Sequence, residues 1–129
     1  MKYLIDSYAW MEYLDGSPDG EIVRSILLQN DEIYTISLVI AEVISGVMRK
    51  NGDINATYEA ISSNSNIICI TPEIAREAGI FHADTRKKIK DFGLMEAIIY
   101  ITGKRLNAKI VTGDQHFQSF KDVIFLSSH

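Results

Sequence analysis

The sequence predicts an α/β fold in which helices cover both faces of a parallel β-sheet. Short apolar runs rich in β-branched residues alternate along the chain with segments whose apolar residues recur at helical spacing. Clusters of Gly, Asn, Asp and Ser separate these segments. Strands that alternate with helices indicate parallel pairing through right-handed crossovers. Because 129 residues are a usual length for one domain, we expect a single three-layer α/β/α domain over residues 1–129.

The first half of the chain predicts two strands and four helices. A short buried strand at residues 3–5 ends on the acid Asp6, and a helical segment follows it. Ser37 ends the second strand and can cap the helix that follows. The elements that we expect are strands at 3–5 and 33–37, with helices at 8–14, 21–28, 38–50 and 54–62.

The second half predicts three strands and two helices. Thr71 and Pro72 are a capping residue and a first-turn proline, which together favour a helix start. Cys69, the lone cysteine, lies in an apolar run and is expected to fill the core. The elements that we expect are strands at 67–70, 109–112 and 123–126, with helices at 72–88 and 94–106.

The composition indicates a cytoplasmic protein without a membrane span. A single cysteine gives no disulfide framework. Asp6 and Glu12 interrupt the opening segment, which therefore does not read as a signal peptide, and no apolar run is long enough to cross a bilayer. A net charge of −4 counts against a nucleic-acid groove if bulk charge alone is considered, but bound divalent cations would reverse the local sign of an acidic cluster.

Four carboxylates are predicted to meet at the carboxyl edge of the sheet. Asp6 ends the first strand and Asp114 follows the fourth, so both emerge where α/β folds place their ligands. Glu42 lies near the start of the helix after the second strand, and Glu96 lies near the start of the helix at 94–106. Both glutamates have apolar neighbours, and a charge in such surroundings needs a partner.

A hard divalent cation would satisfy all four acids at once. Magnesium prefers oxygen ligands, and such an ion activates water and stabilises charge on a phosphoryl group. The alternative gives each acid a structural role: Asp6 and Asp114 would cap the turns that follow them, while Glu42 and Glu96 would lie on solvated faces. The joint placement of the four acids favours the metal site.

Three ordered segments carry a family resemblance: Leu4-Ile5-Asp6-Ser7, then residues 37–43 (SLVIAEV), and finally residues 110–117 (IVTGDQHF). Together they resemble the motifs of the PIN-domain ribonucleases, and most closely those of the small VapC-type toxins of toxin–antitoxin pairs. The resemblance covers nearly the whole chain. It implies a five-stranded parallel sheet, an endoribonuclease dependent on Mg²⁺ or Mn²⁺, frequent homodimerisation, and an inhibitory antitoxin encoded nearby.

The resemblance also assigns individual residues. Asp6 matches the first acid of the family pattern, Glu42 the second, and Asp114 the last. Thr112 matches the small hydroxyl residue that often precedes the last acid, and Ser7, next to the first acid, is a second supporting residue.

The third acid departs from the family pattern. An aspartate usually precedes an alanine in this helix, whereas this chain has Glu96 before Ala97. The extra methylene moves the carboxylate by roughly 1.5 Å, and a misplacement of about 1 Å can cost about a hundredfold in rate. The departure therefore raises the alternative of reduced activity or a shifted metal. Asp91 is a second candidate for this position, although its place just outside the helix favours a capping role.

Three further features have alternative interpretations. His116 either touches a phosphate or a metal-bound water, or is a surface histidine of a loop. The aromatic residues of the opening helix either pack on the sheet or face a partner. A basic run either holds an RNA backbone or forms a solvated helix end; it consists of Arg86, Lys87, Lys88 and Lys90.

The predicted function is metal-dependent hydrolysis of RNA phosphodiester bonds, as the toxin of a type II toxin–antitoxin pair. Asp6, Glu96 and Asp114 would hold the ion, and Glu42 would be a further ligand or the base for the attacking water. One alternative is a catalytically weakened domain that binds RNA or its antitoxin without cutting. Another is a receiver-like signalling domain, but this expects paired acids after the first strand and a lysine after the last, and the chain has neither.

Overall fold

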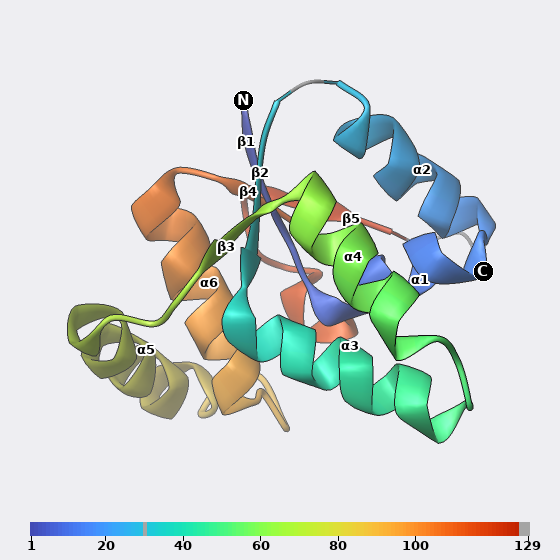
Figure 1. Ribbon diagram of the computed structural model, residues 1–129. Helices are drawn as coiled ribbons and strands as arrows, with labels where there is room; N and C mark the ends of the chain where they lie inside the picture. Colours follow the sequence, from blue (N-terminus) through green and yellow to red (C-terminus); the bar gives the residue numbers. More distant parts are fainter. Residues whose placement is uncertain (30, 127–129) are drawn as a thin grey trace.

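The structure, a computed structural model, describes residues 1–29 and 31–126 and is built around a parallel sheet (Figure 1). All pairs of neighbouring strands in this sheet are parallel. The strands are β1 (Lys2–Ile5), β2 (Glu32–Ile36), β3 (Asn66–Ile68), β4 (Lys109–Thr112) and β5 (Val123–Phe125), in the spatial order β3-β2-β1-β4-β5. The expected α/β class with five parallel strands is confirmed.

Helices cover both faces of the sheet (Figure 1). They are α1 (Ser7–Asp15), α2 (Pro18–Leu27), α3 (Ser37–Arg49), α4 (Ile54–Asn64), α5 (Pro72–Thr85) and α6 (Leu94–Leu106), with a short 3₁₀ helix η1 (Gln115–Phe117). The chain moves outward from β1 to β3 through α1–α4 and returns to β4 through α5 and α6. Right-handed crossovers therefore place these two groups of helices on opposite faces. Among the described helices, none is both long and apolar enough to cross a membrane.

The central strand β1 determines where the functional edge of the sheet forms. Tyr3, Leu4 and Ile5 are all buried, as expected for a strand that is covered by helices on both faces. Ile5 pairs with Val111 of β4, and the backbone N–H of Asp6 continues this ladder by donating to the Val111 carbonyl at 3.2 Å. The segments that follow β1 and β4 therefore begin side by side.

Trp10 of α1 is the largest fully buried side chain among the described residues. Its indole Nε1–H donates to the Thr35 hydroxyl at 3.1 Å, and that hydroxyl donates to Ser65 Oγ at 2.9 Å. The buried indole thus links α1, β2 and the end of α4 by packing and by hydrogen bonds. Of the two interpretations of the aromatic residues in the opening helix, packing on the sheet is correct for Trp10.

Cys69 is exposed, and the expectation that it fills the core is wrong. The first part of its apolar run, up to Ile68, belongs to β3, which is an edge strand of the sheet, and Cys69 follows the last residue of that strand. β3 spans only Asn66–Ile68, and two of its three residues are exposed. Because the edge strand has a neighbour on one side only, an apolar run at this place does not imply burial.

Several predicted helix ends and caps differ from the structure, among them the start of α2, which lies at Pro18 and not at residue 21. Ile36 occupies the N-cap position of α3 without a side-chain hydrogen bond, so Ser37 is the first helical residue and not the cap. Helix α5 ends at Thr85, three residues before the predicted end, and the basic run lies in the turns beyond it. Asp91 has a left-handed backbone (φ 61°) and Gly93 takes the N-cap position of α6, so Asp91 is not a cap.

We expect Trp10→Phe to lower the free energy of unfolding by about 2 kcal/mol, because the smaller ring leaves a cavity and removes the donor to Thr35. Urea denaturation followed by circular dichroism measures this, since the substitution removes the only tryptophan of the chain. Tyr58→Phe, at an exposed aromatic residue, is the matched control and should change the midpoint little. An equal midpoint for Trp10→Phe and the parent would contradict the role given to the indole.

Candidate functional site

Four carboxylates from separate segments gather at the carboxyl edge of the sheet. Asp6 follows β1 and Asp114 follows β4, which are neighbouring strands. Glu42 lies in the second turn of α3, the helix entered from β2, and Glu96 lies in the first turn of α6. Their charges act on one another: Asp114 and Glu42 raise the pKa of Asp6, and Glu96 and Asp114 raise that of Glu42. The structure thus brings all four predicted acids within electrostatic reach.

Asp6 is the buried member of this group, with only 3% of its surface exposed. Burial raises the pKa of its carboxyl to about 7, against the lowering effect of hydrogen bonds from the Thr112 hydroxyl and the Ala9 N–H. The Ala9 N–H donates to Asp6 Oδ1 at 3.0 Å, so the carboxylate caps α1. Asp6 therefore caps α1 and also belongs to the acidic group.

Thr112 connects the two aspartates. Its hydroxyl is buried, hydrogen-bonds the Asp6 carboxylate, and accepts the backbone N–H of Asp114 at 3.0 Å. The next residue, Gly113, lies directly under the ring of Tyr8, where a Cβ atom would overlap the ring carbons. The backbone that carries Asp114 is therefore held against α1 by contacts that no larger residue at position 113 would allow.

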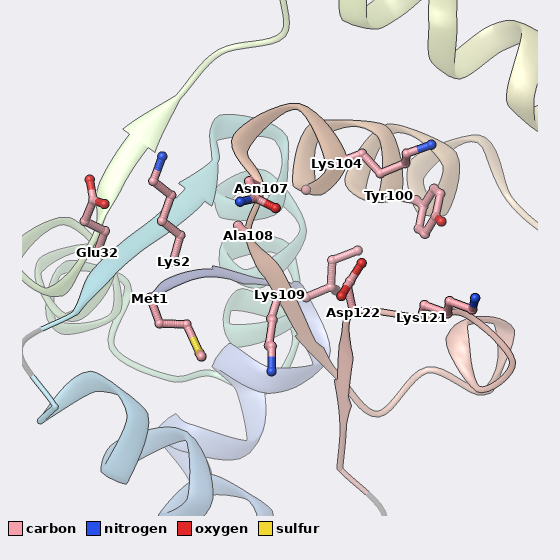
Figure 2. A pocket seen from close by; sticks show the side chains of 12 residues that line it. Met1, Lys2, Glu32, Tyr100, Lys104, Asn107, Ala108, Lys109, Lys121 and Asp122 are labelled. Carbon is pink, nitrogen blue, oxygen red and sulfur yellow. The ribbon is translucent and has the colours of Figure 1, made fainter.

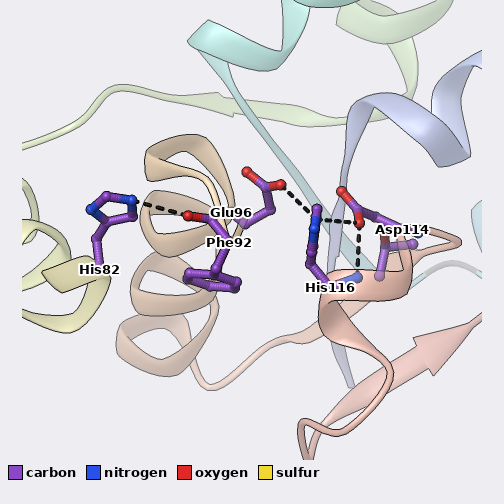
Figure 3. A network of polar contacts seen from close by, with 6 residues as sticks. His82, Phe92, Glu96, Asp114 and His116 are labelled. Carbon is purple, nitrogen blue, oxygen red and sulfur yellow. Dashed lines mark hydrogen bonds and ion pairs between the residues drawn. The ribbon is translucent and has the colours of Figure 1, made fainter. Parts of the chain in front are cut away.

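His116 lies between two of the carboxylates (Figure 3). Its Nδ1 is 3.0 Å from Glu96 Oε1 and 3.0 Å from Asp114 Oδ1. Asp114 Oδ1 also accepts the His116 backbone N–H at 2.9 Å, which starts η1 and turns the imidazole back toward the acids. His116 is therefore part of the acidic group rather than a detached loop residue, and the short spacing from Asp114 was the available signal in the sequence.

Glu42 lies on the solvent-facing rim of the group. Partial burial raises the pKa of its carboxyl, a hydrogen bond with the Ser7 side chain lowers it, and the charges of Glu96 and Asp114 raise it. A groove of about 780 Å³ opens beside Glu42 between α1 and α3. This groove extends from Ser7 and Glu42 to Arg49 and Lys50, so it joins the acidic group to basic side chains.

A second hollow, of about 530 Å³, lies at the opposite edge of the sheet (Figure 2). It is lined by residues at the amino ends of the strands, among them Lys2, Glu32 and Lys109. None of the four carboxylates lines it. This hollow is therefore separate from the acidic group.

The loop between α5 and α6 carries the predicted basic run and ends at the acidic group. His82 Nε2 lies within hydrogen-bond distance of the Phe92 carbonyl, at 3.0 Å, and so ties the end of this loop to α5 (Figure 3). The four basic side chains are exposed, and Lys87 pairs with Asp84 at 3.6 Å. The run consists of Arg86, Lys87, Lys88 and Lys90.

The charges in this group are largely uncompensated by the protein. Within residues 1–29 and 31–126, no lysine or arginine forms an ion pair with any of the four carboxylates, and His116 pairs with two of them, Glu96 and Asp114. The potential ligand atoms of Glu96, Asp114 and His116 all lie within 4.8 Å of one another. Carboxylate oxygens with one imidazole nitrogen are a donor set that suits a divalent cation, so the residues present fit a metal.

Comparisons with known proteins agree with this architecture. The PIN domain family model matches residues 3–123. The chain resembles a toxin–antitoxin complex component from Klebsiella pneumoniae (21% identity, TM-score 0.76, covering 97% of this chain and 98% of the other). It resembles VapBC2 from Rickettsia felis bound to promoter DNA equally well (21%, 0.76, 97% and 97%). Mycobacterium tuberculosis VapC20, a sarcin–ricin loop cleaving toxin, is also similar (13%, 0.71, 92% and 95%). No curated protein sequence gave a significant match.

We expect the metal-free Asp6→Asn variant to be more stable than the parent at pH 8 by up to about 4 kcal/mol, with the difference vanishing near pH 4. The Asp6 carboxyl has a higher pKa in the folded protein than in the unfolded chain, so the parent loses stability as the pH rises from about 4 to about 7. Thermal denaturation in EDTA across this range measures the difference.

The matched control is Asp53→Asn, which alters an N-cap aspartate that is exposed. A constant difference in stability between Asp6→Asn and the parent at every pH would contradict the burial of an ionisable carboxyl at this position.

Proposed function

The chain belongs to the PIN domain family, and from this premise we propose that it is a metal-dependent endoribonuclease that hydrolyses phosphodiester bonds of RNA. The observation that supports this most directly is the group of four carboxylates, one of them buried, without a lysine or arginine partner among the described residues. A cluster of this kind binds cations and so attracts a phosphodiester despite the acidic composition of the chain. We propose that residues 1–129 act as one nuclease domain.

In this proposal Asp6, Glu96 and Asp114 hold a Mg²⁺ or Mn²⁺ ion. Bound there, the ion would supply Lewis acidity for the phosphoryl group and lower the pKa of a water molecule. The Thr112 hydroxyl fixes the two aspartates relative to each other through its hydrogen bonds. The rigidity of this arrangement matters because rate depends steeply on the placement of reacting groups.

In this proposal Glu42 accepts a proton from the attacking water, or is a further ligand. Its carboxyl has a raised pKa, which makes it a stronger base than an ordinary surface glutamate. The hydrogen bond with the Ser7 side chain restricts its orientation. Its place on the rim, beside the groove between α1 and α3, leaves it accessible to substrate.

The RNA backbone is proposed to follow basic side chains that flank the acids. Arg49 and Lys50 lie at the far end of the groove that starts at Glu42. The exposed run on the other side, in the loop that leads to α6, would contribute charge contacts to phosphates. This run comprises Arg86, Lys87, Lys88 and Lys90.

We also propose that the protein is the toxin of a type II toxin–antitoxin pair, that a small antitoxin protein inhibits it, and that it forms a homodimer. The similar structures from Klebsiella pneumoniae and Rickettsia felis are toxin–antitoxin assemblies, and the likeness extends over nearly the full length of both chains. Co-expression with the product of an adjacent small gene, followed by co-purification and light scattering, tests the pairing and the dimer.

We expect the parent to cleave single-stranded RNA with Mg²⁺ or Mn²⁺ and not in EDTA, and we expect Asp6→Asn and Asp114→Asn each to lower the rate at least about a hundredfold. Fluorescent oligoribonucleotides resolved on denaturing gels measure the cleavage, with Asp53→Asn as the control. If Asp6→Asn cuts as fast as the parent, the proposed metal site is wrong. If the parent binds RNA but never cuts it, the binding-only alternative is favoured.

We expect Glu96→Asp to lower the cleavage rate about tenfold, because the shorter side chain withdraws the carboxylate from His116 and Asp114. The same cleavage assay measures this. Glu96→Gln keeps the length of the side chain but removes its charge, so comparing the two variants separates the effect of length from the effect of charge. A sharp rise in rate for Glu96→Asp would instead show that glutamate at this position weakens the enzyme.

A further inference from the structure

His116 Nδ1 lies equally close to two carboxylate oxygens, only one of which is its hydrogen-bond partner. Its Nδ1 is 3.0 Å from an oxygen of Glu96 and 3.0 Å from an oxygen of Asp114. A ring nitrogen carries at most one hydrogen, so as a donor it makes one full hydrogen bond, here with Glu96 Oε1, and its second contact, with Asp114 Oδ1, is an ion-pair distance only. A cation near the three atoms can be contacted by the nitrogen and by both oxygens at once. The arrangement therefore suits a cation shared by all three atoms.

The spacing of the three donors also suits a small divalent ion. Two ligands at right angles on an ion with bonds of about 2.1 Å are about 3.0 Å apart, which is the separation of Nδ1 from each carboxylate oxygen. All three donor atoms fall within 4.8 Å of one another. They come from α6, from the end of β4 and from η1, so they converge on one position from separate elements.

Neighbouring groups hold the imidazole in place. The ring of Phe92 meets it edge-on, with the centroids 6.4 Å apart at an interplanar angle of 87°. The backbone N–H of His116 is bound to Asp114, which fixes the direction in which the side chain leaves η1. Figure 3 shows the imidazole between the Glu96 and Asp114 side chains. The packing of Phe92 on the ring and the capping of η1 by Asp114 thus hold Nδ1 toward the two carboxylates.

We propose that His116 Nδ1 is a direct ligand of the metal, and that this nitrogen makes the site select Mn²⁺ or a later first-row divalent ion over Mg²⁺. The proposal rests on the metal-dependent nuclease function. Imidazole binds first-row transition ions well, whereas magnesium prefers a shell of oxygens. A site with carboxylates alone would not make this distinction to the same degree. In this proposal His116 determines which divalent ion binds, and the carboxylates supply the negative charge that attracts it.

Calorimetric titration of the metal-free protein with MnCl₂ and with MgCl₂ tests the selectivity. We expect His116→Gln to weaken Mn²⁺ binding at least tenfold and Mg²⁺ binding less than threefold. His116→Asp should restore binding with a preference shifted toward Mg²⁺. His82→Gln is the matched control, because His82 also lies beside Phe92 but contacts its backbone and is not a member of the metal-ligand group. Equal weakening of both metals by His116→Gln would overturn the proposal.

Electron paramagnetic resonance of bound Mn²⁺ gives a readout that does not depend on activity or on a variant that folds. A ¹⁴N coupling from a directly bound imidazole is expected in the parent and in His82→Gln, and its loss is expected in His116→Gln. Bound Mn²⁺ without nitrogen coupling in the parent would overturn the proposal, and so would a parent that binds no divalent ion.

The two proposals fail in different ways. Nitrogen-coordinated Mn²⁺ in a protein that cuts no RNA would support His116 as a metal ligand and refute the nuclease function. RNA cleavage that proceeds equally with Mg²⁺ and Mn²⁺, and is unchanged in His116→Gln, would support the nuclease function and refute His116 as a metal ligand.

Discussion

Repulsion among four close carboxylates is the constraint on which the organisation of this edge of the sheet depends. The fold offsets part of it without a lysine or arginine partner for these acids among the described residues. Asp6 caps α1, Asp114 caps η1, and Glu96 lies in the first turn of α6. Backbone N–H groups at the two caps, and the positive end of a helix at α6, stabilise negative charge at these places. The remaining charge would attract a cation, so the side chains that cap α1 and η1 would also be ligands of the proposed metal.

The buried hydroxyl of Thr112 and the glycine after it show how the core supports this edge. Thr112 bonds both aspartates, and Gly113 lets the ring of Tyr8 pack directly on the backbone. Tyr8 in turn donates its hydroxyl to Asp19 of α2 at 3.3 Å. The loop that carries Asp114 is therefore fixed by neighbours on both sides, and a larger residue at position 113 would push that loop away from α1.

Local sequence patterns predicted most of the fold, because apolar periodicity and turn residues report secondary structure directly. The strands, the order of the helices and the four acids were found in this way. Two features depended on how distant segments pack. Cys69 is exposed where the chain leaves β3, an edge strand, and a local apolar run does not reveal the order of the strands in the sheet. His116 joins the acids because Asp114 caps η1 and α6 brings Glu96 to the same place.

The pairing of β1 with β4 has a consequence for the synthesis of the protein. Tyr3 and Lys109 are partners in the sheet although more than one hundred residues separate them. On the ribosome, β1 is made before β4 and lacks this neighbour until the segment up to Thr112 has emerged, and contacts between such distant segments form slowly. The acidic group cannot assemble before that moment, so a nascent chain has no complete site until nearly all of these 129 residues have been translated.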